Sequence, residues 1–121
     1  MKTAILILTV VAVFPSLAAP ELPACSSISE FVADTPPPAP SDHFRDFRID
    51  RAALCEIMSS YVVVTRDQWL HRYSHVAFGD RTGTATVERG AVLRWMVRPG
   101  GLATLTFPAG EVVYLAREAP Q

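Results

Sequence analysis

The last third of the chain, residues 83–117, limits the fold most strongly. It contains four short runs rich in β-branched and apolar residues, and the first three of them end in glycine-bearing turns. Runs of this length separated by such turns are typical of consecutive antiparallel strands joined as hairpins. We therefore expect an α+β fold built on a small antiparallel meander of four to five strands, packed against one or two helices.

The alternation of side chains predicts which face of this sheet is buried, because successive residues of a strand point to opposite faces. The apolar face of the second run carries Leu93, Trp95 and Val97. If that face forms the core, the outer face carries Arg94, Arg98, Thr104, Thr106 and Tyr114. A sheet with one apolar face needs a cover, and the best candidate is a helix predicted at residues 50–59.

Upstream of the meander, helical signals dominate. Residues 41–60 are predicted to be helical in one or two pieces, with Asp50 as the cap of a helix that carries an apolar stripe. The run 61–65 has the composition of a strand and is too apolar for an exposed edge, so we expect it to be buried against the helix. Residues 26–32 are predicted to form a short helix, and residues 78–83 a loop.

Residues 65–76 fit two periodicities. Thr65 and Gln68 have the spacing of a capping box, which favours a helix. Strict alternation would instead place Trp69, His71, Tyr73 and His75 on one face of a strand. The capping signal makes the helix our prediction.

The N-terminus has the features of a secretory signal peptide, which we assign to residues 1–18. Lys2 is followed by an apolar run of about half the length that a membrane span needs, and the small residues Ser16 and Ala18 stand at the two positions that a signal peptidase reads. An extended arm at 19–41 with a proline-rich spacer at 35–40 follows, and the α+β domain is assigned to 42–121. We expect no transmembrane helix in the mature chain.

Composition indicates the origin and excludes one class of partner. The chain contains no Asn, and Lys2 is its only Lys, which favours a GC-rich bacterial genome. The formal net charge is −1 and moves toward about −2 once Lys2 is removed with the signal, so no nucleic-acid partner is implied. We predict a periplasmic or secreted protein.

Two cysteines, Cys25 and Cys55, form an even pair in an exported chain, and an oxidising compartment favours a disulfide between them. The bridge would pin the N-terminal arm across the predicted helix at 50–59. An alternative remains open, because residues 22–25 resemble the sequence that precedes a lipid-modified cysteine in bacterial lipoproteins. In that case Cys25 would anchor an envelope protein to the membrane.

One group of residues suggests a metal-binding site. On a helix, Asp67, His71 and His75 would lie one turn apart on the same face, where they could bind zinc or copper. If the segment is a strand, the two imidazoles are too far apart to share an ion. The chain carries no nucleophile-elbow or phosphate-loop motif, so an enzyme is the less favoured interpretation and a cofactor other than this metal is not expected.

A binding surface is the favoured functional hypothesis. Arginine combined with an aromatic side chain on a rigid sheet is the composition of interface hot spots, and the outer face offers Arg94, Arg98 and Tyr114. We therefore expect an exported, non-enzymatic binding or accessory protein whose partner is a protein or another envelope component. The metal site and the lipid anchor are its alternatives.

Overall fold

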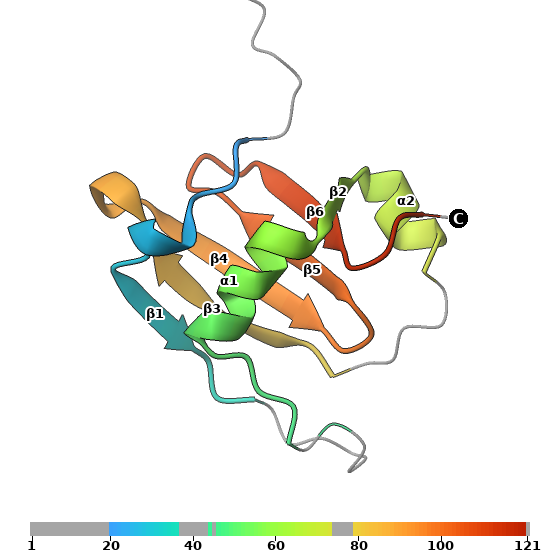
Figure 1. Ribbon diagram of the computed structural model, residues 1–121, viewed down its shortest axis with the longest axis horizontal. Helices are drawn as coiled ribbons and strands as arrows, with labels where there is room; N and C mark the ends of the chain where they lie inside the picture. Colours follow the sequence, from blue (N-terminus) through green and yellow to red (C-terminus); the bar gives the residue numbers. More distant parts are fainter. Residues whose placement is uncertain (1–19, 37–43, 45, 74–78, 121) are drawn as a thin grey trace, which may run out of the picture.

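A six-stranded antiparallel sheet forms the centre of the molecule (Figure 1), in a computed structural model that describes residues 20–36, 44, 46–73 and 79–120. Two α-helices and short 3-10 turns complete the described part. The elements are η1 (Cys25–Ser27), β1 (Glu30–Ala33), α1 (Arg51–Ser60), β2 (Val62–Val64), α2 (Arg66–His71), β3 (Arg81–Thr86), η3 (Glu88–Gly90), β4 (Val92–Arg98), β5 (Leu102–Thr106) and β6 (Val112–Ala116). Neither helix is long and apolar enough to cross a membrane.

The predicted meander is confirmed as strands β3, β4, β5 and β6, which pair in chain order. The β4–β5 hairpin turns at Gly100 and Gly101, whose φ angles of 101° and 96° lie in the region that favours glycine. The predicted loop at 78–83 is wrong at its end, because β3 already begins at Arg81. That residue pairs with Val97 across the ladder, an interaction that local sequence does not reveal.

Two further strands flank the meander and raise the strand number above the predicted four to five. β1 pairs with β3 and β2 pairs with β6, giving the order β1-β3-β4-β5-β6-β2. The helix predicted at 26–32 is therefore wrong, since this stretch forms η1 and then β1. A four-residue strand has few local signals, and its pairing with a strand some fifty residues later decides its structure.

The position of β2 also corrects the sequence analysis. We expected this apolar run to be buried, but β2 is an edge strand of the sheet. Val62 and Val63 are 42% and 48% exposed, and only Val64 is buried. The short run therefore serves mainly to connect α1 with α2 and to place one side chain under α2.

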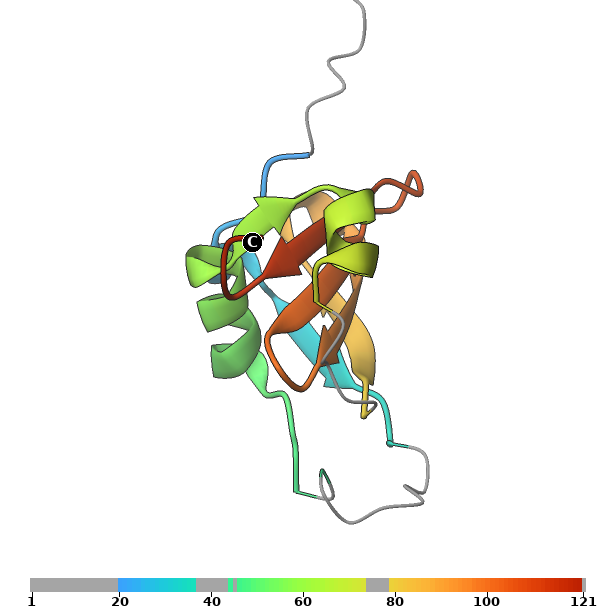
Figure 2. The same ribbon diagram turned by 90° about the vertical axis from the view of Figure 1, so that its right-hand side faces the viewer.

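Helix α1 covers one face of the sheet, as predicted (Figure 2). Asp50 caps it by accepting a hydrogen bond from the backbone N–H of Ala53 at 2.7 Å, and the described residues just before Asp50 are not helical. Its apolar stripe packs on the predicted core face of the meander, where Trp95 is 2% exposed and stacks on Phe31 of β1. The buried stripe consists of Leu54, Ile57 and Met58.

The disulfide between Cys25 and Cys55 is present and joins η1 to α1, with 5.2 Å between the Cα atoms. The bridge holds the segment that leads into β1 against the helix, next to the buried Ile28. The predicted role of the pair is therefore confirmed. A disulfide of this kind is consistent with an oxidising compartment.

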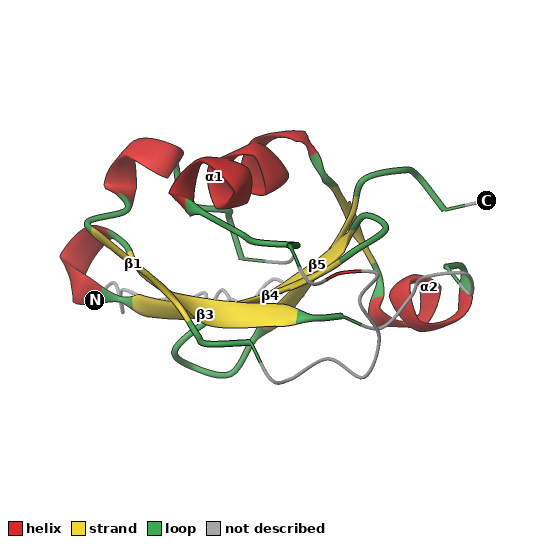
Figure 3. Ribbon diagram, turned by 90° about the horizontal axis from the view of Figure 1, so that it is seen from below, coloured by secondary structure: helices red, strands yellow, loops and turns green. Residues whose placement is uncertain are grey.

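Helix α2 covers part of the opposite face (Figure 3). The capping box predicted from Thr65 and Gln68 is formed, with each residue's side chain accepting a hydrogen bond from the backbone N–H of the other. Helix is thus confirmed for residues 66–71, whereas residues 74–78 lie outside the described part. Trp69 is buried in a second small cluster with Val64, Leu102 and Ala116.

Candidate functional site

The outer face of the sheet, opposite α1, is defined by the register of the strands. Residues that pair directly across a ladder share a face, so the side chains of this face form rows across the sheet. One row, centred on Arg94, contains Val32, Thr84, Arg94, Thr106 and Val112. The next row contains Thr82, Met96, Thr104, Tyr114 and Val64.

Helix α2 divides this face into a covered and an open half. It packs over the end of the sheet where Leu102, Ala116 and Val64 are buried. Tyr114 lies at the border, with its ring 5.7 Å from that of Trp69. The row through Arg94 lies beyond this cluster. We call the open half, consisting of the Arg94 row together with Glu30, Thr86 and Val92, the Arg94 face.

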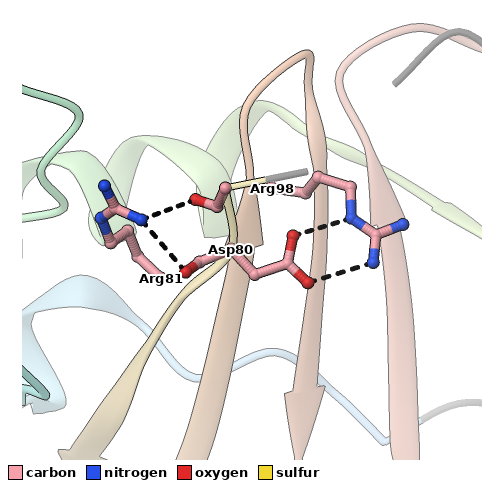
Figure 4. A network of polar contacts seen from close by, with 4 residues as sticks. Asp80, Arg81 and Arg98 are labelled. Atoms are coloured by element: carbon pink, nitrogen blue, oxygen red, sulfur yellow. Dashed lines mark hydrogen bonds and ion pairs between the residues drawn. The ribbon is translucent and has the colours of Figure 1, made fainter. Parts of the chain in front are cut away.

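Arg98 belongs to the covered half. Its guanidinium lies 5.0 Å from the ring centroid of Trp69 and donates two hydrogen bonds to the carboxylate of Asp80, at 2.8 and 3.1 Å (Figure 4). The hydrogen bonds to this carboxylate raise the pKa of Arg98 above its ordinary value, although partial burial opposes the shift. Its charge is thus directed to Asp80 and is less available to a partner than that of Arg94.

Arg94 is exposed, and its guanidinium is the positively charged group of the open half. No hydrogen bond or ion pair of its guanidinium occurs within the described part of the chain. Threonines flank it on both neighbouring strands, and Val32, Val92 and Val112 around it are 42%, 46% and 37% exposed. Three exposed valines surround this guanidinium, and the exposed carboxylate of Glu30 lies in the next row, where it pairs with Thr86.

The other strand-end arginine, Arg81, is an anchor. It is 7% exposed and donates hydrogen bonds to the backbone carbonyls of Phe44, Phe47, Gly79 and Asp80. Figure 4 shows the bond to Asp80. These bonds tie the segment before α1 and the start of β3 together. They also hold Asp80 where its carboxylate reaches Arg98. Arg81 and Arg98 therefore both have structural partners, which Arg94 lacks within the described residues.

The predicted metal ligands are only partly within the described residues. Asp67 and His71 lie on the same exposed side of α2, with 3.6 Å between the carboxylate and Nε2. His75 lies outside the described part. Among the described residues no three His, Cys, Asp or Glu side chains gather into a metal-binding group. The metal site therefore stays a prediction.

Two residues that shape this region were not predicted from the sequence: Trp69, which covers the second cluster, and Asp80, which is the partner of Arg98. The capping box before Trp69 is a local signal for the helix, but the face that the helix covers follows only from the sheet order. Asp80 and Arg98 are separated by 18 positions without any motif. Only their proximity in the fold reveals the pair.

The groups on the Arg94 face are suited to binding. A guanidinium can donate a bidentate pair of hydrogen bonds to a carboxylate, threonine hydroxyls can donate or accept, and the valines offer apolar contact. Comparisons with protein-family models, with curated proteins and with solved structures found no match. The functional argument therefore depends on this geometry.

Proposed function

We propose that the protein is an exported, non-enzymatic binding protein that docks an acidic partner protein on the Arg94 face. The observation that carries the proposal is the uncompensated Arg94 at the centre of an open, half-apolar sheet face. An arginine surrounded by apolar and small polar side chains resembles an interface hot spot with its water-excluding ring. The periplasm or the extracellular space suits the disulfide and the N-terminal sequence.

Rigidity supports this proposal. Arg94 lies in the middle of β4, which is hydrogen-bonded on both sides, to β3 and to β5. The opposite side of the same strand is buried under α1, where Leu93 and Trp95 are 1% and 2% exposed. A side chain that projects from such a strand loses less backbone entropy on binding than one on a loop.

The test is capture of envelope proteins on the immobilised protein, followed by titration with the purified partner. Arg94→Glu should abolish capture, and Arg94→Ala should weaken binding about 30-fold, the effect of a hot spot of roughly 2 kcal/mol. Arg66→Glu makes the same charge change at an exposed position of α2, outside the Arg94 face, and serves as the matched control. A partner retained by Arg94→Glu would contradict the proposal.

A lipid anchor and the disulfide exclude each other, because both require the sulfur of Cys25. In the structure this sulfur is bonded to that of Cys55. Intact mass of the protein from its native host distinguishes the two. The loss of two hydrogens indicates the disulfide, whereas added acyl mass indicates the anchor.

A further inference from the structure

A groove lies on the side of the sheet opposite the Arg94 face. It runs between α1, the segment leading into α1 and the β4–β5 hairpin, and has a cavity volume of about 630 Å³. Its base includes the buried Ile57 and Val97. Binding sites for small molecules have volumes of roughly 300–1,000 Å³ and are mostly apolar, with a few placed polar groups. The groove has this size and this composition.

Small residues keep the groove open. Ala52 and Ala53 form its wall on α1, and Gly100 and Gly101 form the wall on the hairpin. The glycines are required by the turn, since both have positive φ angles. Ala53 packs against the core, whereas Ala52 is exposed on a helix in which a larger side chain would be tolerated conformationally, so the small size of Ala52 leaves room that the fold does not need.

Arg117 is seated at the hairpin side of the groove. Its backbone N–H donates to the carbonyl of Gly101 at 2.8 Å. A Cβ on Gly101 would lie 2.9 Å from the Cβ of Arg117 and 3.1 Å from its Nε, so the missing side chain is what allows the arginine to lie there. The guanidinium is exposed and has no hydrogen bond or ion pair within the described residues.

The charges around the groove favour an anion. Three arginines, Arg48, Arg98 and Arg117, line it against one carboxylate, Glu56. Arg98 is directed to Asp80 on the other side of the sheet, and Arg48 donates to a backbone carbonyl at 2.9 Å. Arg117 is therefore the cation positioned to receive an anionic group. A ligand that suits this groove has an apolar body, which contacts the accessible apolar lining, and an anionic head, which binds Arg117.

We propose that this groove binds a single medium-chain fatty acid, with the alkyl chain along the half-buried Phe47, Ala53 and Tyr61 of its lining and the carboxylate on Arg117. The planar guanidinium fork matches a carboxylate in bidentate geometry. The alkyl chain replaces water over apolar side chains that α1 leaves accessible. This site is separate from the Arg94 face, so the two proposals succeed or fail independently.

Titration of the protein with decanoate, followed by NMR or calorimetry below the micelle concentration, tests the proposal. Saturable 1:1 binding is expected, with affinity rising about two- to fourfold for each methylene from hexanoate to decanoate. Decanol, which has the same chain without the charge, should bind at least tenfold more weakly. Arg117→Gln should reduce decanoate affinity by a similar factor, and Ala52→Phe should block the groove.

Arg94→Gln is the matched control, since it removes one exposed guanidinium on the other face and should leave decanoate binding unchanged. Equal affinity for decanol and decanoate would overturn the role of the anion. Unchanged decanoate affinity in Arg117→Gln, an affinity independent of chain length, or loss of binding in Arg94→Gln would each overturn the assigned site. Absence of saturable binding would overturn the proposal as a whole.

Discussion

Removing the disulfide should destabilise the protein by about 3.6 kcal/mol. The bridge joins residues separated by 30 positions, and the chain-entropy relation for a closed loop of about this length gives a denatured-state entropy loss of roughly 12 cal/mol/K. The perturbation is the double variant Cys25→Ala/Cys55→Ala. Alanine at position 55 suits the helix interior, so the variant removes the link with little other change to α1.

Urea unfolding followed by tryptophan fluorescence measures the effect, since Trp69 and Trp95 are both buried and report on the two sides of the sheet. The free energy of unfolding by linear extrapolation should fall by about 3.6 kcal/mol. Wild-type protein held in reducing agent should match the variant. A fall below about 1 kcal/mol would refute the reasoning, because η1 and β1 would then be held by packing and strand pairing without the link.

Three further predictions follow from close packing, buried charge and titration. Gly83→Ala should lower the free energy of unfolding by about 3 kcal/mol, since its Cβ would collide with the backbone carbonyl oxygen of Val32 and with the ring of Trp95; denaturant unfolding checks this. Arg81→Met should destabilise by about 3 kcal/mol in the same assay, because backbone carbonyls lose a buried donor. Burial, and secondarily the charge of Glu118, raises the pKa of Tyr73 above 10.0, so stability should fall as pH rises above 10.0, and less steeply in Tyr73→Phe. Thermal unfolding at pH 8 to 11 measures that difference.

Features with local signals were predicted from the sequence. The cap of α1 at Asp50 and the capping box of α2 depend on side chains three residues from the backbone groups that they satisfy. The meander depends on strands joined by short turns, and its buried face follows from alternation. The disulfide was predicted from the pair of cysteines together with the predicted signal peptide. The caps and the strands use information contained within a few neighbouring residues, whereas the disulfide uses the count of cysteines in the whole chain.

Features set by distant pairing were not predicted. β1 is held by β3, and β2 has its place at the sheet edge because β6 is its partner. No pattern inside either short run specifies those partners. Among the candidate site residues, Arg94, Arg98 and Tyr114 were placed correctly on one face, but their different environments depend on α2. The sequence identifies α2 as a helix without revealing where it packs.

The length of α2 explains why half of the outer face is open. Its six residues span about 9 Å at 1.5 Å per residue, which is a small part of a six-stranded sheet whose strands lie roughly 4.8 Å apart. The side chains below it change accordingly along β5, from buried Leu102 to Thr104 and Thr106 beyond the cluster. Threonines suit a sheet face in contact with water, so solubility accounts for them. The exposed valines around Arg94 are the apolar part of the contact surface that we propose for this face.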